Sequence, residues 1–495
     1  MVYESLRDWI SKLEEEGELK HINTEVDWNL ELGSIVRRVS DQKGPALLFE
    51  NIKDHHNTPF RKFFALGMGT RERAAMSLGL PKTADYRDIV QFLKEGFNKL
   101  IKPVIVSTGP VKQNIVKGDA VNLNEIPVPK YHHLDGGRYI NTHAATITMD
   151  PDSKIMNIGM YRGMICDDAK SIAVLLARSL HWGVHYSKHE QRGDEMPVTV
   201  VYGLDPALKI CAGVPIRHPN HSEYDVIGGL RGAPVELVKC ETSDLYVPAA
   251  AEIVIEGRIS SDPATFQLEG PFGEYTGFYG GMSRRRQIIK VDCITYRDDP
   301  IFQGCPEGTS PGHLYGHVNW LVPANCAIAW RYLEDVGVPN VLGVWAHPVT
   351  HGTNMRVQID KIYRGHAKQV AAALWGSHIS KDYAKNLIVV DKDIDIFSEE
   401  ALEWALAYRT NAAMDDVQFF MGTMGSMLDP STPLPQRDNV KYGAGKTARV
   451  LIDATTNWDL DIEPQYGDRR EPPLCTIIDP EMDKLISRRW HEYGF

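Results

Sequence analysis

Two glutamates stand five residues apart in the segment Glu269-Gly-Pro-Phe-Gly-Glu274, a spacing that could perform acid–base chemistry. Pro271 does not fit the interior of a helix or a sheet, and the two glycines allow backbone angles that other residues avoid. The segment is therefore predicted to be a shaped loop. Two carboxyl groups held near each other and near a cation titrate apart, so one can act as an acid at neutral pH. The same spacing also fits a solvated turn with two surface acids.

A candidate cation lies in the stretch Asn157-Ile-Gly-Met-Tyr-Arg162. Positions five apart on a strand would diverge unless the chain bends, and Gly159 and Gly163 could supply that bend. The guanidinium of Arg162 is a planar fork suited to a carboxylate. The alternative is an ordinary surface arginine on a strand.

Histidines cluster in the same part of the chain. His181, His185 and His189 follow one another at four-residue steps, which on a helix gives one face and can make a metal site, although we place His189 in the loop after the helix. His218 and Glu223 lie close together in a proline-containing tract. An imidazole, an amide and a carboxylate from different elements would suit Mn²⁺ or Mg²⁺, ions that hold phosphate oxygens well. The sequence alone does not select which of these groups converge.

Length and composition limit the class of protein. A chain of 495 residues exceeds what one hydrophobic core usually serves, so two or three domains are expected. The net charge of −11 is spread without a basic block, which argues against a nucleic-acid partner. The apolar runs are far too short to cross a bilayer, so no membrane partner is expected. Seven scattered cysteines without a Cys-x-x-Cys pair indicate a reducing, cytoplasmic location.

The pattern of elements predicts an α/β protein of several domains. Residues 1–115 mix helices with short strands, and residues 116–308 are predicted to be a β-rich barrel with one inserted helix at 172–181. From 309 to 475 helices and strands alternate again, which indicates a second α/β domain. Residues 476–495 are predicted to form a closing helix that Asp479 and Pro480 begin. The barrel strands are predicted at 198–202, 253–259 and 288–294.

Taken together, these stretches resemble the UbiD family of reversible decarboxylases, which use prenylated FMN. The resemblance runs in order along nearly the whole chain. It is carried by residues 157–162, 215–223, 238–248, 252–257, 269–274, 392–397 and 490–495. It implies an amino-terminal α/β domain, a central split β-barrel that binds the flavin, and a carboxy-terminal α/β domain used in oligomer formation.

The resemblance also implies roles for particular residues. The catalytic set falls on Arg162, Glu269 and Glu274. The divalent-metal set, for Mn²⁺ or Mg²⁺ and often accompanied by K⁺, falls on Asn157, His181 and Glu223, with His185 as the alternative to His181. Where several relatives place a lysine over the flavin, this chain has His378. The implied cofactor-binding residues are Asn157, Met160, Tyr161, Arg162, His181, Pro215, Glu223 and His378.

The implied reaction is the reversible, non-oxidative decarboxylation of an aromatic, heteroaromatic or α,β-unsaturated acid through a covalent adduct with prenylated FMN. No side chain can stabilise the carbanion that CO₂ leaves behind, so a cofactor must supply the electron sink. Arg162 would hold the carboxylate and Glu274 would protonate the carbon. The pocket walls are expected at 275–282, 313–319 and His378.

The resemblance implies two protein partners as well: a flavin prenyltransferase that supplies the cofactor, and further copies of this chain in a homodimer or homohexamer. Two other functions stay open on the residues alone. One is a flavin-binding reductase or carrier that does not decarboxylate. The other is a metal-dependent hydrolase that uses His181 and His185.

Overall fold

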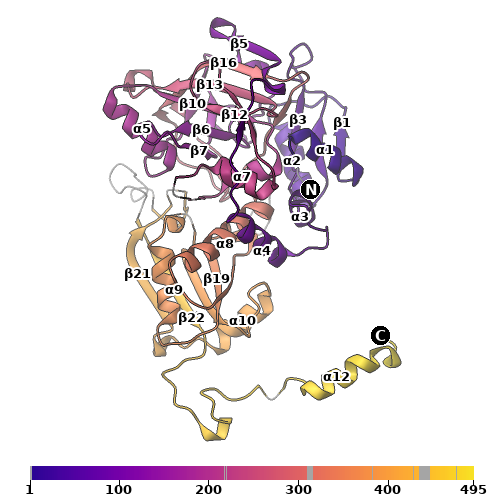
Figure 1. The fold of residues 1–495 in the computed structure, drawn as a ribbon, viewed down its shortest axis with the longest axis vertical. Helices are drawn as coiled ribbons and strands as arrows, with labels where there is room; N and C mark the ends of the chain where they lie inside the picture. Colours follow the sequence, from indigo (N-terminus) through magenta and orange to yellow (C-terminus); the bar gives the residue numbers. More distant parts are fainter. Residues whose placement is uncertain are drawn as a thin grey trace.

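Three packed domains and an extended arm make up the chain in the computed structural model (Figure 1). The structure describes residues 3–216, 218, 220–308, 316–381, 383–426, 428–433, 446–474 and 476–495. His313, part of one expected pocket wall, and Cys475 lie outside the described residues. The mixed α/β architecture is the one expected from the sequence.

The first domain packs helices on a four-stranded sheet. Helix α1 (Leu6–Glu15) begins at a capping box on Ser5 and buries the apolar face that its sequence predicts. The sheet has the order β1-β2-β3-β17, and its last strand arrives from residue 301 to pair in parallel with β3. The other bounds are β1 (Leu19–Ile22), α2 (Glu31–Asp41), β2 (Ala46–Phe49), β3 (Lys62–Ala65), α3 (Arg71–Ser77), α4 (Tyr86–Gly96) and β17 (Ile301–Gln303).

The central domain is a curled antiparallel sheet with the strand order β7-β6-β10-β13-β16-β9-β8, and β5 also pairs with β16. Its bounds are β5 (Asn114–Lys117), β6 (Ala145–Met149), β7 (Met156–Gly159), β8 (Gly163–Ile165), β9 (Ser171–Val174), β10 (Met196–Tyr202), β13 (Ile253–Ile259) and β16 (Ile288–Tyr296). The three predicted barrel strands lie in β10, β13 and β16. Their alternating, β-branched sequences pair in continuous register along β10 and β13.

The prediction of a helix at 172–181 is wrong. Ser171–Val174 is strand β9, in which Ile172 pairs with Ile289 of β16 and Ile165 of β8. The inserted helix is α5 (His181–Arg192), so His189 lies within the helix and not in a following loop. A short, buried run of β-branched residues satisfies its backbone in the sheet more readily than in a helix.

Two further helices and two small sheets complete the central domain. The helices are α6 (Pro206–Gly213), with Asp205 as its N-cap, and α7 (Glu223–Arg231), with Ser222 as its N-cap. The order of one small sheet is β12-β11-β4, and the other pairs β14 with β15. Their bounds are β4 (Val104–Ile105), β11 (Glu236–Lys239), β12 (Tyr246–Pro248), β14 (Gln267–Glu269) and β15 (Arg284–Arg286).

The carboxy-terminal domain is a five-stranded sheet of order β18-β19-β20-β22-β21, parallel across β19, β20 and β22. The bounds are α8 (Val318–Asp335), β18 (Val341–Trp345), β19 (Asn354–Ile359), α9 (His366–Trp375), β20 (Asn386–Asp391), α10 (Glu399–Tyr408), β21 (Val417–Met424) and β22 (Lys446–Ala454). The chain then leaves the body as an arm that carries α12 (Pro480–Arg489), and none of the residues of α12 is buried (Figure 1).

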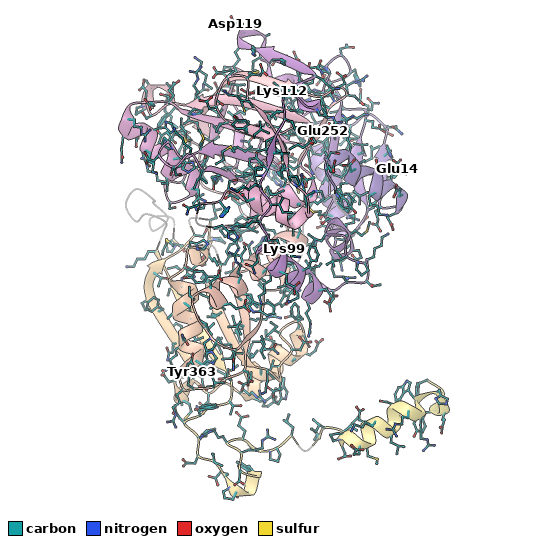
Figure 2. All side chains as sticks on the ribbon, viewed as in Figure 1. Glu14, Lys99, Lys112, Asp119, Glu252 and Tyr363 are labelled. Atoms are coloured by element: carbon teal, nitrogen blue, oxygen red, sulfur yellow. The ribbon has the colours of Figure 1, made fainter. Side chains whose placement is uncertain are left out.

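Continuous apolar packing and a buried ion pair fix the domains relative to one another. One buried cluster runs from Leu6 of α1 through α6 to Leu451 of β22. Arg7 of α1 donates to both carboxylate oxygens of the fully buried Glu252, each at 2.9 Å. Glu252 is labelled in the upper part of the body in Figure 2. The ion pair joins the amino-terminal and central domains, and the apolar cluster continues into the carboxy-terminal domain, at whose junction with the central domain the site lies. Among the described residues, no helix combines the length and apolar character needed to cross a membrane.

Candidate active site

The segment with the two glutamates is a closed loop between β14 and β15, as its glycines and proline predict. Glu269 is the last residue of β14. The backbone N–H of Glu274 donates to the carbonyl of Phe278 at 2.9 Å, which folds the loop back on itself. Gly270 has a φ of 98°, a region that favours glycine. The backbone therefore fixes where both carboxyl groups point.

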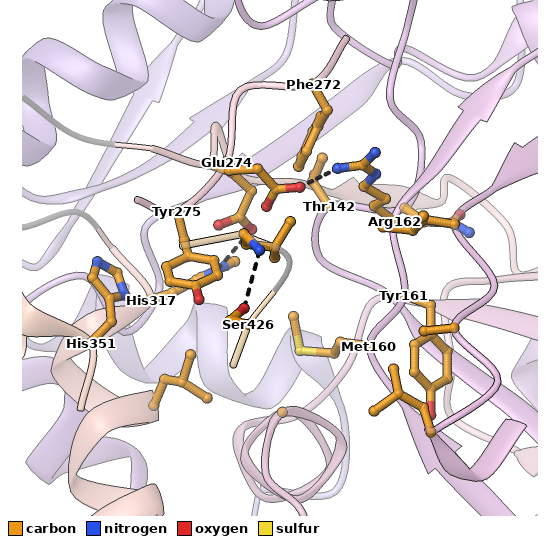
Figure 3. Close-up of a pocket in the computed structure, with 18 of the residues that line it drawn as sticks. Thr142, Met160, Tyr161, Arg162, Phe272, Glu274, Tyr275, His317, His351 and Ser426 are labelled. Carbon is orange, nitrogen blue, oxygen red and sulfur yellow. Dashed lines mark hydrogen bonds and ion pairs between the residues drawn. The ribbon is translucent and has the colours of Figure 1, made fainter. Parts of the chain in front are cut away.

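Arg162 lies in the short link between β7 and β8 and contacts both glutamates. Its Nε is 3.0 Å from Oε1 of Glu269, and its Nη2 donates to Oε2 of Glu269 at 3.1 Å. Its Nη1 forms a short hydrogen bond with Oε1 of Glu274 (Figure 3). A Cβ atom at position 280 would lie 2.7 Å from Cγ of Glu274, so Gly280 permits this close approach. The structure thus brings together the three residues implied as catalytic.

Arg162 is shared by two buried glutamates, and one of them, Glu274, titrates near neutral pH. Burial raises the pKa of Glu274 to about 7, the charges of Glu307 and Glu269 add to the rise, and Arg162 opposes it. Burial alone would lower the pKa of Arg162, but the two carboxylates raise it. Arg162 is therefore a permanent cation, and Glu274 is a group that can hold or release a proton at neutral pH.

A cavity of about 280 Å³ lies beside this network, between the central and carboxy-terminal domains. The central domain contributes Arg162, Glu274 and mostly apolar neighbours, while the carboxy-terminal domain contributes a more polar wall (Figure 3). A concave, mostly apolar site with a few converging polar groups is the usual form of a small-molecule site. Its lining includes Asn141, Thr142, Met160, Tyr161, Phe272, Tyr275, Glu307, His317, His351, Tyr383, Ser426 and Leu428.

The three residues of the implied metal set converge at a second, neighbouring hollow. Asn157 lies on β7, while His181 and Glu223 are the first residues of α5 and α7. The amide of Asn157 is 2.7 Å from Nδ1 of His181 and, with its nitrogen facing them, 3.3 Å from Oε1 of Glu223. Oε2 of Glu223 accepts the N–H of Ile158 at 2.9 Å.

The chemistry of this donor set fits a hard divalent ion. Burial raises the pKa of Glu223 to about 7, and the ion pairs of the described residues do not include this carboxylate. A buried carboxylate without a cation is costly, and a divalent ion bound by the amide oxygen, the imidazole and the carboxylate would remove that cost. Asn157, His181 and Glu223 could therefore hold such an ion together with a phosphate.

His185 also lines this hollow, but its ring has a partner other than Asn157. Nδ1 of His185 is 2.9 Å from Oγ1 of Thr148 on β6, and burial lowers the pKa of His185 to about 4. Nδ1 of His189 lies 3.9 Å from Oδ2 of Asp194. His181 is thus the histidine of α5 that the structure places against Asn157.

The remaining implied cofactor residues divide between two places. Met160 and Tyr161 line the cavity, and Tyr161 stacks on Trp182 with ring centroids 4.1 Å apart. Nε2 of His378 is 3.1 Å from the carbonyl oxygen of Pro215, so these two residues contact each other across the domain junction. Neither belongs to the described residues that line the cavity.

A buried polar cluster forms part of one wall of the cavity, and of its members only His317 was expected from the sequence. Nδ1 of His317 is 3.0 Å from Oε1 of Glu307, and Nε2 of His317 is 2.8 Å from Nδ1 of His143. Ligand-type atoms of His143, Cys305 and His317 lie within 4.8 Å of one another. Lys209 is fully buried nearby, and its Nζ has no hydrogen-bond partner among the described residues.

Replacing Lys209 by methionine is expected to stabilise the cofactor-free fold by on the order of 3 kcal/mol at pH 7. Burial lowers the pKa of Lys209 from 10.5 to about 7. The unfolded chain therefore binds more protons than the folded chain between these two values, and the penalty falls as pH rises through that window. The gain should be about half as large at pH 9. Urea unfolding of both proteins at the two pH values measures it, and a variant less stable than wild type at pH 7 would contradict the expectation.

The sequence predicted only part of the cavity wall. The expected wall at 275–282 contributes Tyr275, and the one at 313–319 contributes His317. Several other lining residues were not predicted. Glu307 sits between Pro306 and Gly308, the same loop composition that marked the two-glutamate segment, so a signal for it existed. His351, Tyr383 and Ser426 come from separate loops of the carboxy-terminal domain, and no local pattern distinguishes them.

The fold and the site define a class of protein: a three-domain enzyme whose split antiparallel sheet places an arginine and two glutamates beside a cavity. Family models assign the chain to one such group. They match the amino-terminal, Rift-related and carboxy-terminal domains of 3-octaprenyl-4-hydroxybenzoate carboxy-lyase at residues 10–93, 102–310 and 320–454. The chain belongs to the UbiD family, and it is a carboxy-lyase.

Individual relatives agree over the full length. The chain is 32% identical to a pyrrole-2-carboxylic acid decarboxylase of Pseudomonas aeruginosa, covering 99% of this chain and 98% of the relative. It is 32% identical to a phenolic acid decarboxylase of Sedimentibacter hydroxybenzoicus, covering 95% of each. The closed vanillic acid decarboxylase of S. hydroxybenzoicus superposes with a TM-score of 0.87 at 29% identity, over all of both chains. HmfF of Pelotomaculum thermopropionicum, solved with FMN, superposes with a TM-score of 0.78 at 29% identity, over 97% of this chain and 98% of that chain.

Proposed function

We propose that this enzyme reversibly decarboxylates an aromatic or heteroaromatic acid, or a related α,β-unsaturated acid, with prenylated FMN as its cofactor. The observation that carries the proposal is the pairing of Arg162 with both Glu269 and Glu274 beside a cavity, in a chain of the UbiD family. The two similar decarboxylases are named for a heteroaromatic and a phenolic acid. Related structures contain FMN or prenylated FMN.

Each catalytic residue has a role that its surroundings support. When bound, prenylated FMN supplies the electron sink that side chains lack. Arg162, a permanent cation, holds the substrate carboxylate through its planar fork. Glu274, whose pKa burial raises to about 7, donates a proton to the carbon that has lost CO₂. Glu269 pairs with Arg162 through two contacts and fixes the direction of the guanidinium.

The cofactor would be held from both domains. Asn157, His181 and Glu223 would bind Mn²⁺ or Mg²⁺ and, through it, the flavin phosphate, because a divalent ion neutralises an anion inside a partly closed site. K⁺ could accompany it. Met160 and Tyr161 line the cavity next to Arg162, and the Pro215–His378 contact would border the cofactor from the carboxy-terminal side. The buried, partner-poor carboxylate of Glu223 supports this assignment.

The enzyme is proposed to be a cytoplasmic homodimer or homohexamer that receives its cofactor from a flavin prenyltransferase. The arm after β22 supports self-association. It exposes large apolar side chains far from the body, including Met482, Leu485, Trp490 and Phe495. Apolar groups presented in this way usually meet another protein surface. A related solved structure is an evolved dimeric form of HmfF.

The rate of decarboxylation is expected to fall as pH rises above about 7. The pKa of Glu274 is raised to about 7, and only its protonated form can donate a proton. Above that value kcat should decrease about tenfold per pH unit, with the protonated fraction. A profile of kcat between pH 5.5 and 9 measures this. A kcat that stays constant to pH 9 would remove Glu274 as the titrating donor.

The proposal is tested by coexpressing the chain with a flavin prenyltransferase and recording the absorption and mass spectra of the purified protein. Bound prenylated FMN, together with CO₂ release from a panel that includes pyrrole-2-carboxylate and hydroxybenzoates, is the expected result. Bound flavin with reductase activity and no CO₂ release would favour a flavin reductase or carrier. Flavin-free protein that loses a hydrolytic activity on chelation would favour a metal-dependent hydrolase.

A further inference from the structure

Tyr139 contacts Glu269, and neither residue is among the described residues that line the cavity. Its hydroxyl donates to Oε1 of Glu269 at 2.8 Å and also lies 3.1 Å from the carbonyl oxygen of Pro271. The side chain is fully buried, and its ring packs on Phe272 with centroids 4.3 Å apart. A neutral phenol that donates to a buried carboxylate stabilises the ionised form of that carboxylate.

The segment that carries Tyr139 also anchors the two-glutamate loop. The N–H of Gly136 donates to the carbonyl of Pro271 at 2.8 Å, and Oδ1 of Asp135 accepts the N–H of Gly273 at 2.9 Å. These backbone contacts place the loop. The hydroxyl of Tyr139 differs from these contacts because it reaches a carboxyl side chain of the loop, that of Glu269.

We propose that Tyr139 is a positioning residue for decarboxylation: its hydroxyl orients the carboxyl group of Glu269 on Arg162, so that Arg162 divides its pairing and does not bind Glu274 alone. Arg162 presents Nε and Nη2 to Glu269 and Nη1 to Glu274. Without the hydrogen bond from Tyr139, the carboxyl group of Glu269 can turn away from Arg162, and more of the charge of Arg162 then acts on Glu274. Glu274 then gives up its proton at lower pH and ceases to be an acid at neutral pH.

The charged and titratable groups around this network come from five segments. Arg162 follows β7, Asp135 and Tyr139 precede β6, and Arg286 lies on β15, where Glu269 raises its pKa against the larger effect of burial. Glu274 is in the loop itself, and Glu307, which also lines the cavity, raises the pKa of Glu274. Arg286 is close enough to influence Glu269, but the hydrogen bonds to Glu269 come from Arg162 and Tyr139. Tyr139 therefore controls Glu269 without adding charge.

The test is the pH profile of kcat for Tyr139→Phe in the flavin-loaded enzyme. The phenyl ring keeps the packing on Phe272 and removes one hydrogen bond to a carboxylate, so kcat at its optimum should fall about tenfold. The alkaline limb should move about one pH unit lower, while KM changes less than about threefold. Tyr3→Phe is the matched control, because Tyr3 is a buried tyrosine that donates to the carbonyl of Met76 at 3.2 Å in another domain.

A purely structural role for Tyr139 would lower the melting temperature and leave the limb in place. A profile that superposes on that of Tyr3→Phe therefore overturns the inference. If Tyr139→Phe does not fold, 3,5-difluorotyrosine at position 139 keeps the hydroxyl and strengthens it as a donor. That variant should keep its activity and move the alkaline limb upward, and an unmoved limb would contradict the inference.

This inference rests on the proposed roles of Glu269 and Glu274. The Glu274→Gln variant distinguishes a failure of the proposed function from a failure of the inference about Tyr139. An active Glu274→Gln enzyme would reject the proposed donor, whatever Tyr139 does. An inactive Glu274→Gln enzyme, combined with an unmoved profile in Tyr139→Phe, would reject the role of Tyr139 alone.

Discussion

Replacing Glu274 by glutamine is expected to lower kcat for decarboxylation by about 10³-fold, with bound flavin unchanged. Glutamine has nearly the same shape and can still accept a hydrogen bond from Arg162, but its amide has no proton to give to carbon. Glu274 lies at the cavity, away from the Asn157, His181 and Glu223 set, so cofactor content should stay at the wild-type level. The measurement is single-turnover CO₂ release together with the flavin absorbance per chain.

Glu256→Gln is the matched control for this variant. Glu256 is a fully buried glutamate of the same domain that accepts the N–H groups of Glu241 and Thr242 and does not line the cavity. Its replacement should lower the melting temperature and leave kcat within about twofold, because the change is structural. Wild-type CO₂ release by Glu274→Gln would remove Glu274 from the role of proton donor.

Replacing Glu223 by alanine is expected to lower the bound flavin per purified chain by at least about tenfold, with a smaller effect on the fold. Glu223 supplies the only carboxylate of the proposed metal set, so its loss weakens the ion that would hold the flavin phosphate. Its burial already raises its pKa to about 7, which means that the folded chain gains little from its charge. Flavin absorbance, metal content and melting temperature of the same sample measure the effects.

Asp225→Asn gives the comparison for Glu223→Ala on the same helix. Asp225 completes the capping box of α7 by accepting the N–H of Ser222 at 3.1 Å, and its loss should destabilise the fold by about 1 kcal/mol. Flavin content should persist in Asp225→Asn and disappear in Glu223→Ala. A Glu223→Ala protein purified with its full flavin complement would refute the metal assignment.

Much of the fold could be predicted from local patterns. The strands in β10, β13 and β16 and the capped last helix are where alternation and caps predicted them. The error at 172–181 has a physical cause. A four-residue buried strand such as β9 shows no period of its own, and its conformation depends on Ile289 and Ile165, which are far away or across a turn.

The sequence motifs predicted the residues of the candidate site that lie in them, but not the residues brought in by packing. The family motifs named Arg162, Glu269 and Glu274, whose side chains meet in the structure. Spacing could not choose between His181 and His185, because four residues apart they share one face of a helix. The difference arises from where α5 begins, since its first residue reaches Asn157 and its fifth reaches Thr148. Tyr383 and Ser426 reach the cavity only through the packing of the carboxy-terminal domain, which no local pattern reports.

The polar wall of the cavity bears on the substrate. His317, His351 and Tyr275 lie on the side of the cavity away from Arg162, and Tyr275 directly follows Glu274 in the chain (Figure 3). A substrate held by its carboxylate on Arg162 would meet rings and imidazoles at its far end. An aromatic acid with a ring heteroatom or hydroxyl offers both a stacking face and a hydrogen-bonding group there.

The central claim, decarboxylation that depends on prenylated FMN, is tested most directly by one assay. CO₂ release from aromatic acids is measured with the same purified protein in three forms: without flavin, reconstituted with FMN, and reconstituted with prenylated FMN. We expect CO₂ only from the last form, with at least one acid of the panel. Equal CO₂ release from the flavin-free protein, or none from protein fully loaded with prenylated FMN on any acid, would contradict the account.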